Sequence, residues 1–189
     1  TQSRSSAASD VYKRQGIDTL EPFLSAAETN GKGVVVLART SNPGSADFQT
    51  QDMGGAPLYA RVVEALQPAI ARLTGASGWS SLMLVAGATG PDEARRLRAM
   101  APSCLMLVPG YGAQGGGAAD ALAGFVRRGN HLEGGVVNAS RSVNFPDRAA
   151  QAADLATWRG AIAAAIDAAQ ADLTSLSGVT DRAGTLAGS

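Results

Sequence analysis

The feature that most constrains the fold of this chain is an alternation of short apolar runs with longer amphipathic segments, which begins near Gly16. The apolar runs read as strands and the amphipathic segments as helices. The expected strands lie within residues 33–42, 80–89, 104–110 and 134–142, and the expected helices within 18–30, 57–73, 91–100, 119–129 and 148–173. Strands joined by helical crossovers run parallel. The pattern therefore predicts an α/β fold, either an open doubly wound sheet or part of a barrel.

Composition narrows the class of function. The chain has 16 Lys and Arg against 16 Asp and Glu, so it lacks the basic surplus that is typical of proteins that bind nucleic acid or anionic membranes. Cys104 is the single cysteine, which rules out a disulfide within the chain and leaves too few ligands for a cysteine-based zinc site. No apolar run reaches the length of a membrane helix, and no signal peptide opens the sequence. We therefore expect a cytoplasmic protein without a metal site.

The same pattern divides the chain into three predicted segments. Residues 1–15 are polar and aperiodic, and resemble a translated cloning linker, which predicts a non-native segment or a disordered one. Residues 16–177 form the predicted domain, and residues 178–189 a frayed tail.

Clusters of Gly, Ser and Asn follow each predicted strand, at residues 40–45, 87–89, 110–117 and 138–142. Both open α/β sheets and barrels bind their ligands at the carboxyl ends of their strands. The strongest cluster is Gly110–Gly117, which we call the glycine loop. Successive glycine N–H groups and a following helix N-terminus suit a phosphate, and Gln114 adds a side-chain amide.

A cation follows the next strand, because Arg141 comes shortly after Val136 and Val137. A guanidinium can donate two parallel hydrogen bonds to phosphate oxygens, although an isolated Arg is more often a solvated surface charge. The loop also permits other interpretations. It can be a purely structural turn, or Gly110, Gly112 and Gly115 can form a G-x-G-x-x-G dinucleotide motif, with Glu133 as the ribose-binding acid.

A serine hydrolase is not indicated. No G-x-S-x-G motif surrounds Ser41, and His131, the single histidine, falls on a polar turn before a strand.

The segments LARTSNPGSADFQ, VAGATGPDEARRLRAMAP and LVPGYGAQGG with the downstream NASRS resemble the orotidine 5'-phosphate decarboxylase family, in its longer bacterial type. The resemblance covers roughly residues 16–175. It implies a (β/α)8 TIM barrel, of which this chain carries about the last four strand-helix units. It also implies a homodimeric carboxy-lyase that converts orotidine monophosphate to uridine monophosphate without a cofactor.

Residue by residue, the resemblance makes Ser41 a pyrimidine contact, Gln114 a contact between phosphate and base, and Arg141 a phosphate contact. The remaining substrate-binding positions that it implies are Gly112, Gly115, Gly116 and Ser140. Tyr111 departs from the family pattern, which has a small aliphatic residue there, and Gly117 departs where an acid is common.

The family's catalytic D-x-K-x-x-D motif does not occur in this sequence, whose only lysines are Lys13 and Lys32. Lys32 precedes a strand, so it is expected at the end of the sheet opposite the site. We therefore expect no catalytic residue in this chain and no activity from it alone. The alternatives are a non-catalytic module that binds nucleotide phosphate and the dinucleotide-binding domain described above.

Overall fold

The computed structural model describes residues 16–177. The predicted linker at 1–15 and the predicted tail at 178–189 lie outside the described residues. In chain order, the elements are the 3-10 helix η1 (Ile17–Leu20), α2 (Glu21–Asn30), β1 (Val34–Arg39), the 3-10 helix η2 (Pro43–Asp47), α3 (Leu58–Arg72), β2 (Ser80–Ala86), α4 (Pro91–Met100), β3 (Cys104–Val108), α5 (Ala118–Ala121), β4 (Val126–Arg128), β5 (His131–Glu133), β6 (Gly135–Val137), α6 (Ser140–Asn144), α7 (Asp147–Ala150) and α8 (Leu155–Ser177).

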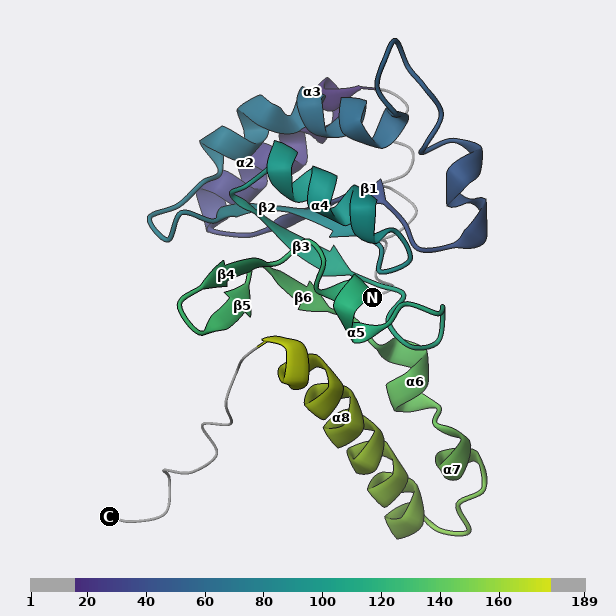
Figure 1. Cartoon of the computed structure of the whole chain (residues 1–189). Helices are drawn as coiled ribbons and strands as arrows, with labels where there is room; N and C mark the ends of the chain where they lie inside the picture. Colours follow the sequence, from purple (N-terminus) through teal and green to yellow (C-terminus); the bar gives the residue numbers. More distant parts are fainter. Residues whose placement is uncertain (1–15, 178–189) are drawn as a thin grey trace, which may run out of the picture.

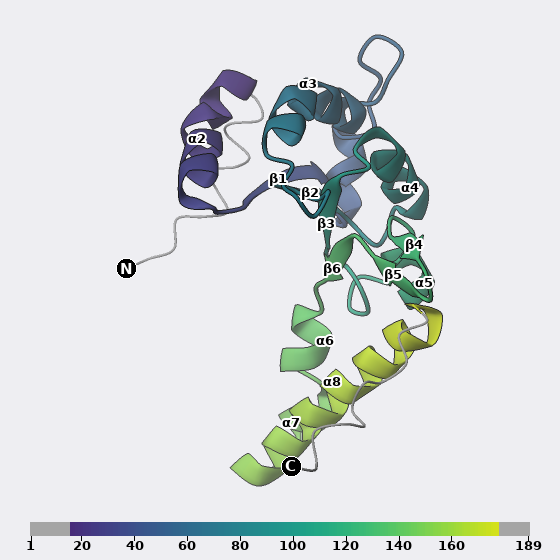
Figure 2. The same ribbon diagram turned by 90° about the vertical axis from the view of Figure 1, so that its left-hand side faces the viewer.

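All four predicted strands are present and form one parallel sheet in the order β1-β2-β3-β6. Helices α2, α3 and α4 lie along one face of this sheet (Figures 1 and 2). Leu84 of β2, Leu66 of α3 and Leu97 of α4 are fully buried where the two layers meet. Burying a leucine contributes roughly 1.5 to 3 kcal/mol, so this layer is the main source of stability. The architecture is the partial barrel-like sheet that the sequence predicts.

The opposite face of the sheet is much less covered, and here one prediction was wrong. The apolar run in β1 predicts a strand buried on both faces, whereas Val35 is 42% exposed and Val136, on the same face of β6, is 56% exposed. Side chains alternate along a strand, so Val36 and Ala38 pack toward the helices while Val35 faces away from them.

The prediction of a helix over 119–129 was also wrong. Helix α5 ends at Ala121, and Val126–Arg128 forms strand β4, which pairs antiparallel with β5. The Gly129–Asn130 pair is the turn of this hairpin, with Gly129 in the left-handed region at φ 58, rather than the end of a helix. Gly124 also approaches β3 closely, because a Cβ there would lie 2.5 Å from the sulfur of Met106.

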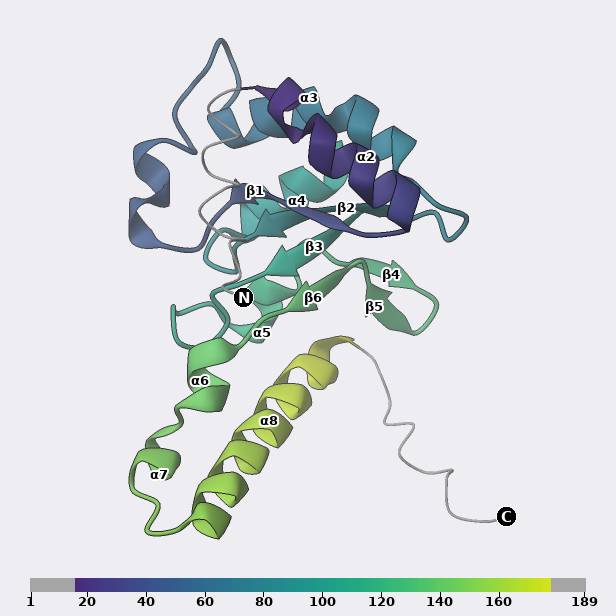
Figure 3. The ribbon, with the colours of Figure 1, turned by 180° about the vertical axis from the view of Figure 1, so that it is seen from behind.

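The predicted helix over 148–173 is two helices. The short α7 ends at Ala150, and α8 begins at Leu155. Asp154 stands just before α8, and its Oδ1 accepts a hydrogen bond of 2.7 Å from the Thr157 N–H. This cap starts a new helix, and its hydrogen bonds lower the pKa of the Asp154 carboxyl. Helix α8 packs against α5, α6 and α7, beyond the β6 edge of the sheet (Figure 3). Within residues 16–177, no helix is long and apolar enough to cross a membrane.

Arg98 joins the elements at the amino end of the sheet. Its guanidinium donates to the carbonyl oxygens of Cys104 at 2.6 Å, Gly134 at 2.7 Å and Gly124 at 2.7 Å, and it lies over the ring of Trp79. Burial lowers the pKa of this side chain from its ordinary value. Arg98 therefore joins α4, the start of β3 and the segments on either side of the β4-β5 hairpin, at the end of the sheet away from the glycine loop.

Candidate functional site

The carboxyl ends of the four parallel strands meet at one edge of the sheet, as predicted. A cavity of about 540 Å³ lies there, lined by residues that follow every strand. Its lining residues are Arg39 at the end of β1, Ser41, Asn42, Pro43, Ser45 and Ala46 after β1, Thr89 after β2, Ala113 and Gln114 after β3, and Arg141 after β6. Ser41, Gln114 and Arg141, three residues that sequence reasoning singled out, thus face one cavity.

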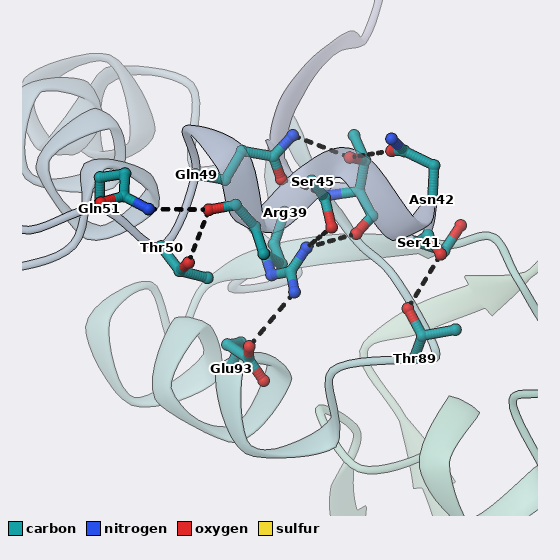
Figure 4. Close-up of polar contacts among 11 residues, drawn as sticks. Arg39, Ser41, Asn42, Ser45, Gln49, Thr50, Gln51, Thr89 and Glu93 are labelled. Atoms are coloured by element: carbon teal, nitrogen blue, oxygen red, sulfur yellow. Dashed lines mark hydrogen bonds and ion pairs between the residues drawn. The ribbon is translucent and has the colours of Figure 1, made fainter.

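Ser41 and Gln114 are in direct contact. Ser41 is 8% exposed, and its hydroxyl donates a hydrogen bond to Oε1 of Gln114. The Ser41 backbone is held in turn by Thr89, whose hydroxyl donates to the Ser41 carbonyl over 3.1 Å (Figure 4). The loops after β1, β2 and β3 are therefore linked through Ser41.

This contact depends on Gly110. Its φ is +97, and a Cβ there would lie 2.6 Å from Cβ of Ser41 and 2.9 Å from Oε1 of Gln114. Only glycine fits a backbone with that conformation and that approach. Ser41 is therefore the residue that approaches the backbone of the glycine loop closely at this point.

Arg141 lies on α6 and is exposed. Besides the larger cavity, it lines a smaller one of about 130 Å³ together with Gln114 and Ser140. Ser140 donates a hydrogen bond of 3.3 Å to Oδ1 of Asn138. A carboxamide, a hydroxyl and a guanidinium thus surround one small space, which is a donor set suited to an anion.

The main-chain amides of the glycine loop are arranged differently from the expected anion cradle. The N–H of Gly112 donates to the Gly116 carbonyl, that of Gly115 to the Gly112 carbonyl, and that of Gly116 to the Gly110 carbonyl. These three amides close the loop's own turns. Gly112 and Gly116 line a separate cavity, beside α8. The side chains around Gln114 and Arg141 converge, whereas these amides are committed within the loop.

Arg39 is a site residue that sequence reasoning missed. It is the last residue of β1, is 8% exposed, and lines the large cavity. Its Nη1 donates to the Ser45 hydroxyl and, over 2.8 Å, to the Thr40 carbonyl, while Nη2 lies 3.4 Å from Oε1 of Glu93 (Figure 4). The available signal was a charged residue at the end of an otherwise apolar run.

The remaining candidates lie elsewhere. Glu133 sits in the β4-β5 hairpin, where its carboxylate is 2.7 Å from Nε of Arg128 and 3.5 Å from Nε2 of His131. This hairpin precedes β6, so it lies at the amino end of the sheet, opposite the glycine loop. Glu133 is therefore not placed to bind the ribose of a dinucleotide held at Gly110, Gly112 and Gly115. Among residues 16–177, no group of three or more His, Cys, Asp or Glu side chains is placed to hold a metal ion.

The chain is similar to known proteins over most of its length. Residues 11–155 match the family described as Orotidine 5'-phosphate decarboxylase / HUMPS family. A curated orotidine 5'-phosphate decarboxylase from Rhodopirellula baltica is 37% identical over 153 residues, which cover 79% of this chain and 50% of that protein. One from Clostridium perfringens is 41% identical over 129 residues, 68% of this chain and 44% of that protein.

The chain is also similar to solved structures. The UMP synthase of Leishmania donovani superposes with a TM-score of 0.59 at 35% identity, over 85% of this chain and 31% of that one. A putative orotidine 5'-phosphate decarboxylase from Streptomyces avermitilis gives 0.56 at 26% identity, over 85% and 52% of the two chains. The chain spans about half the length of the curated relatives it matches. With its parallel sheet and its loops converging at the carboxyl ends of the strands, it belongs to the orotidine 5'-phosphate decarboxylase / HUMPS family.

Proposed function

We propose that this chain supplies the nucleotide-binding part of an orotidine 5'-phosphate decarboxylase, and that the whole enzyme converts orotidine monophosphate to uridine monophosphate and CO2. The observation that carries the proposal is the meeting of Ser41, Gln114 and Arg141 at one cavity.

Each of the three side chains has a chemistry that suits a part of this nucleotide. The Ser41 hydroxyl suits the polar edge of the pyrimidine, and the Arg141 guanidinium suits the phosphate. Gln114 lies between them, since it contacts Ser41 and lines the small cavity with Arg141. Ser140 adds a hydroxyl on the phosphate side. With Gly112, Gly115 and Gly116 closing the turns of the loop, we assign those glycines the role of shaping it rather than of donating to the anion.

In the whole enzyme, binding of the phosphate contributes to the reaction rate as well as to the affinity for the substrate. Contacts to a remote, non-reacting part of a substrate supply binding energy that aligns the reacting group and closes the site. In the family, a Lys protonates the carbon that CO2 leaves, beside an Asp that crowds the substrate carboxylate. The motif that carries these two groups does not occur in this sequence. Lys32 lies before β1, at the other end of the sheet. The chain alone is therefore proposed to bind nucleotide without turning it over.

The family resemblance adds two further proposals. The active form of the whole enzyme is a homodimer, and it works in the cytoplasm on a small-molecule substrate without a cofactor.

Calorimetric titration of the purified chain with uridine monophosphate and, separately, with NAD tests the proposal. We expect uridine monophosphate to bind and NAD to bind much more weakly. A preference for NAD would favour the dinucleotide interpretation, and binding to neither would overturn the proposal. The same preparation should decarboxylate orotidine monophosphate no faster than buffer does. Measurable turnover would contradict the proposal that the chain binds the nucleotide without catalysing its decarboxylation.

A further inference from the structure

Tyr111 connects the glycine loop to helix α8. Tyr111 is 9% exposed and belongs to the hydrophobic core, and its hydroxyl donates a hydrogen bond of 2.7 Å to Oδ2 of Asp172 on α8. The two residues are 61 positions apart in the sequence. This hydrogen bond thus joins the glycine loop to α8, two segments that are far apart in the sequence.

The loop that carries Tyr111 is rich in glycine, although hydrogen bonds between its own main-chain groups close its turns. Gly110 and Gly112 flank Tyr111, and both have positive φ, at 97 and 72. Glycine loses more conformational freedom on ordering than any other residue. Two contacts outside the loop, from Gln114 to Ser41 and from Tyr111 to Asp172, therefore help to keep it in one conformation before a ligand arrives.

The glycine loop also lies next to the helix that carries Arg141. Gly112 follows Tyr111 and lies close to α6, because a Cβ at Gly112 would be 3.2 Å from the Ser142 hydroxyl oxygen. Ser142 is the residue after Arg141, and α6 itself packs on α8. Helix α8 therefore supports both sides of the small cavity, the glycine loop through Tyr111 and the arginine through α6.

Helix α8 makes this support at its carboxyl half. Leu155, Trp158 and Ile166 in the earlier part are 59%, 43% and 39% exposed, whereas Ala169 and Leu173, beside Asp172, are packed against the core. The hydrogen bond to Tyr111 therefore lies beside residues of α8 that pack against the core.

We propose that Tyr111 and Asp172 form an anchor that holds the glycine loop in its ligand-ready position. Tyr111 also lines the small cavity, and its hydrogen bond to Asp172 strengthens binding of the phosphate by ordering this loop. The inference rests on the proposed function for its effect on affinity. Tyr111 and Asp172 are positioning residues, because a loop that is already ordered by this hydrogen bond loses less conformational entropy when the ligand binds.

The test compares the wild-type chain with Tyr111→Phe, which keeps the ring and removes the hydroxyl. In the absence of ligand, hydrogen exchange at the amides of Gly112, Gly115 and Gly116 should be about tenfold faster in the variant, because those amides close the turns of the loop. Unchanged exchange would overturn the anchor, whatever the chain binds.

Affinity is the second measurement. Tyr111→Phe should raise the Kd for uridine monophosphate by about five- to tenfold and leave the Kd for uridine nearly unchanged, since uridine has no phosphate. Asp172→Asn keeps an acceptor oxygen and should fall between the wild type and Asp172→Ala. An equal rise for both ligands, or no rise for either, would overturn the proposed effect on affinity.

Asp154→Ala is the matched control. It removes another α8 carboxylate, the cap at the far end of the helix, and should lower the melting temperature without changing the Kd for uridine monophosphate. If it raised this Kd as much as Tyr111→Phe does, general loosening of α8 would explain the result and the anchor would be rejected. Failure of the wild-type chain to bind uridine monophosphate would overturn the proposed function and the affinity effect with it, while the exchange measurement would still decide whether the anchor exists.

Discussion

The Ser41 hydroxyl donates a hydrogen bond to the carboxamide oxygen of Gln114, 73 positions further along the chain. This contact places the loop after β1 directly against the glycine loop after β3. Two segments that match the same family pattern in the sequence are thus one unit of structure, and the predictions below follow from how that unit is built.

Gly110→Ala should disrupt the contact between Ser41 and Gln114. The new Cβ would lie 2.6 Å from Cβ of Ser41, at a residue whose φ of +97 already disfavours a side chain. We expect the affinity for uridine monophosphate, measured by calorimetry, to fall by about tenfold or more, which corresponds to roughly 1.4 kcal/mol.

Gly115→Ala is the matched control for this loop. Its φ is +92, but a Cβ there would meet no atom within 4 Å, so it adds backbone strain without a collision. Its loss of affinity should be clearly smaller. Equal losses in the two variants would mean that strain, and not the approach to Ser41, accounts for the effect.

Arg39→Ala should destabilise the fold at the cavity wall. The buried guanidinium bonds Ser45 and the Thr40 carbonyl, and its removal leaves those groups without their partner. We expect the free energy of unfolding in urea to fall by about 2 to 4 kcal/mol. Arg95→Ala removes an exposed ion pair with Asp92 and should cost no more than about 0.5 kcal/mol. Similar losses in both variants would show that Arg39 contributes no more than a surface charge.

Arg98→Met should separate stability from binding. Arg98 satisfies carbonyl oxygens at the amino end of the sheet, so its loss leaves buried acceptors unpaired and should cost about 3 to 5 kcal/mol of stability. Provided that the protein remains folded, its Kd for uridine monophosphate should not change, because the site is at the other end of the strands. The milder Arg98→Lys serves if the first variant does not fold. A change in Kd at full folding in either variant would contradict this division of roles.

Cys104 should be unreactive in the folded chain, and it gives stability a dependence on pH. Burial raises the pKa of its thiol to about 11, from an ordinary value of 9.0. Because the unfolded thiol ionises first, its contribution to stability is complete below pH 9 and is lost as the pH rises toward 11. Cys104→Ala should reduce that loss between pH 9 and 11 in urea titrations, and a disulfide reagent at pH 8 should modify Cys104 only on unfolding. Rapid modification of the native protein would show that the thiol is accessible.

The order of strands and helices could be predicted because apolar periodicity reports directly on burial. The hairpin of β4 and β5 could not, since Arg127 and Arg128 before Gly129 also fit the end of a helix. The difference is made by tertiary contacts: Gly124 must approach Met106, and Arg98 bonds the carbonyls of Gly124 and Gly134.

The site was predictable in its side chains and not in its backbone. Gln114 and Arg141 follow neighbouring strands, so parallel topology alone brings them together. The bonds that the glycine amides form depend on backbone torsions, and composition does not specify these. Arg39 was missed for a related reason, because the apolar run around it was interpreted as strand and its charge was not given a role.

The central claim is that Gln114 and Arg141 converge on the phosphate of one nucleotide. The most direct test is the ratio of the Kd for uridine to the Kd for uridine monophosphate, measured in the wild-type chain and in Arg141→Gln. Charge-assisted hydrogen bonds are worth about 1.5 to 3 kcal/mol, so the wild type should prefer the monophosphate by roughly 10- to 100-fold. The account predicts that Arg141→Gln abolishes most of this preference and leaves the affinity for uridine unchanged. A variant that still prefers the monophosphate as strongly as the wild type does would contradict it.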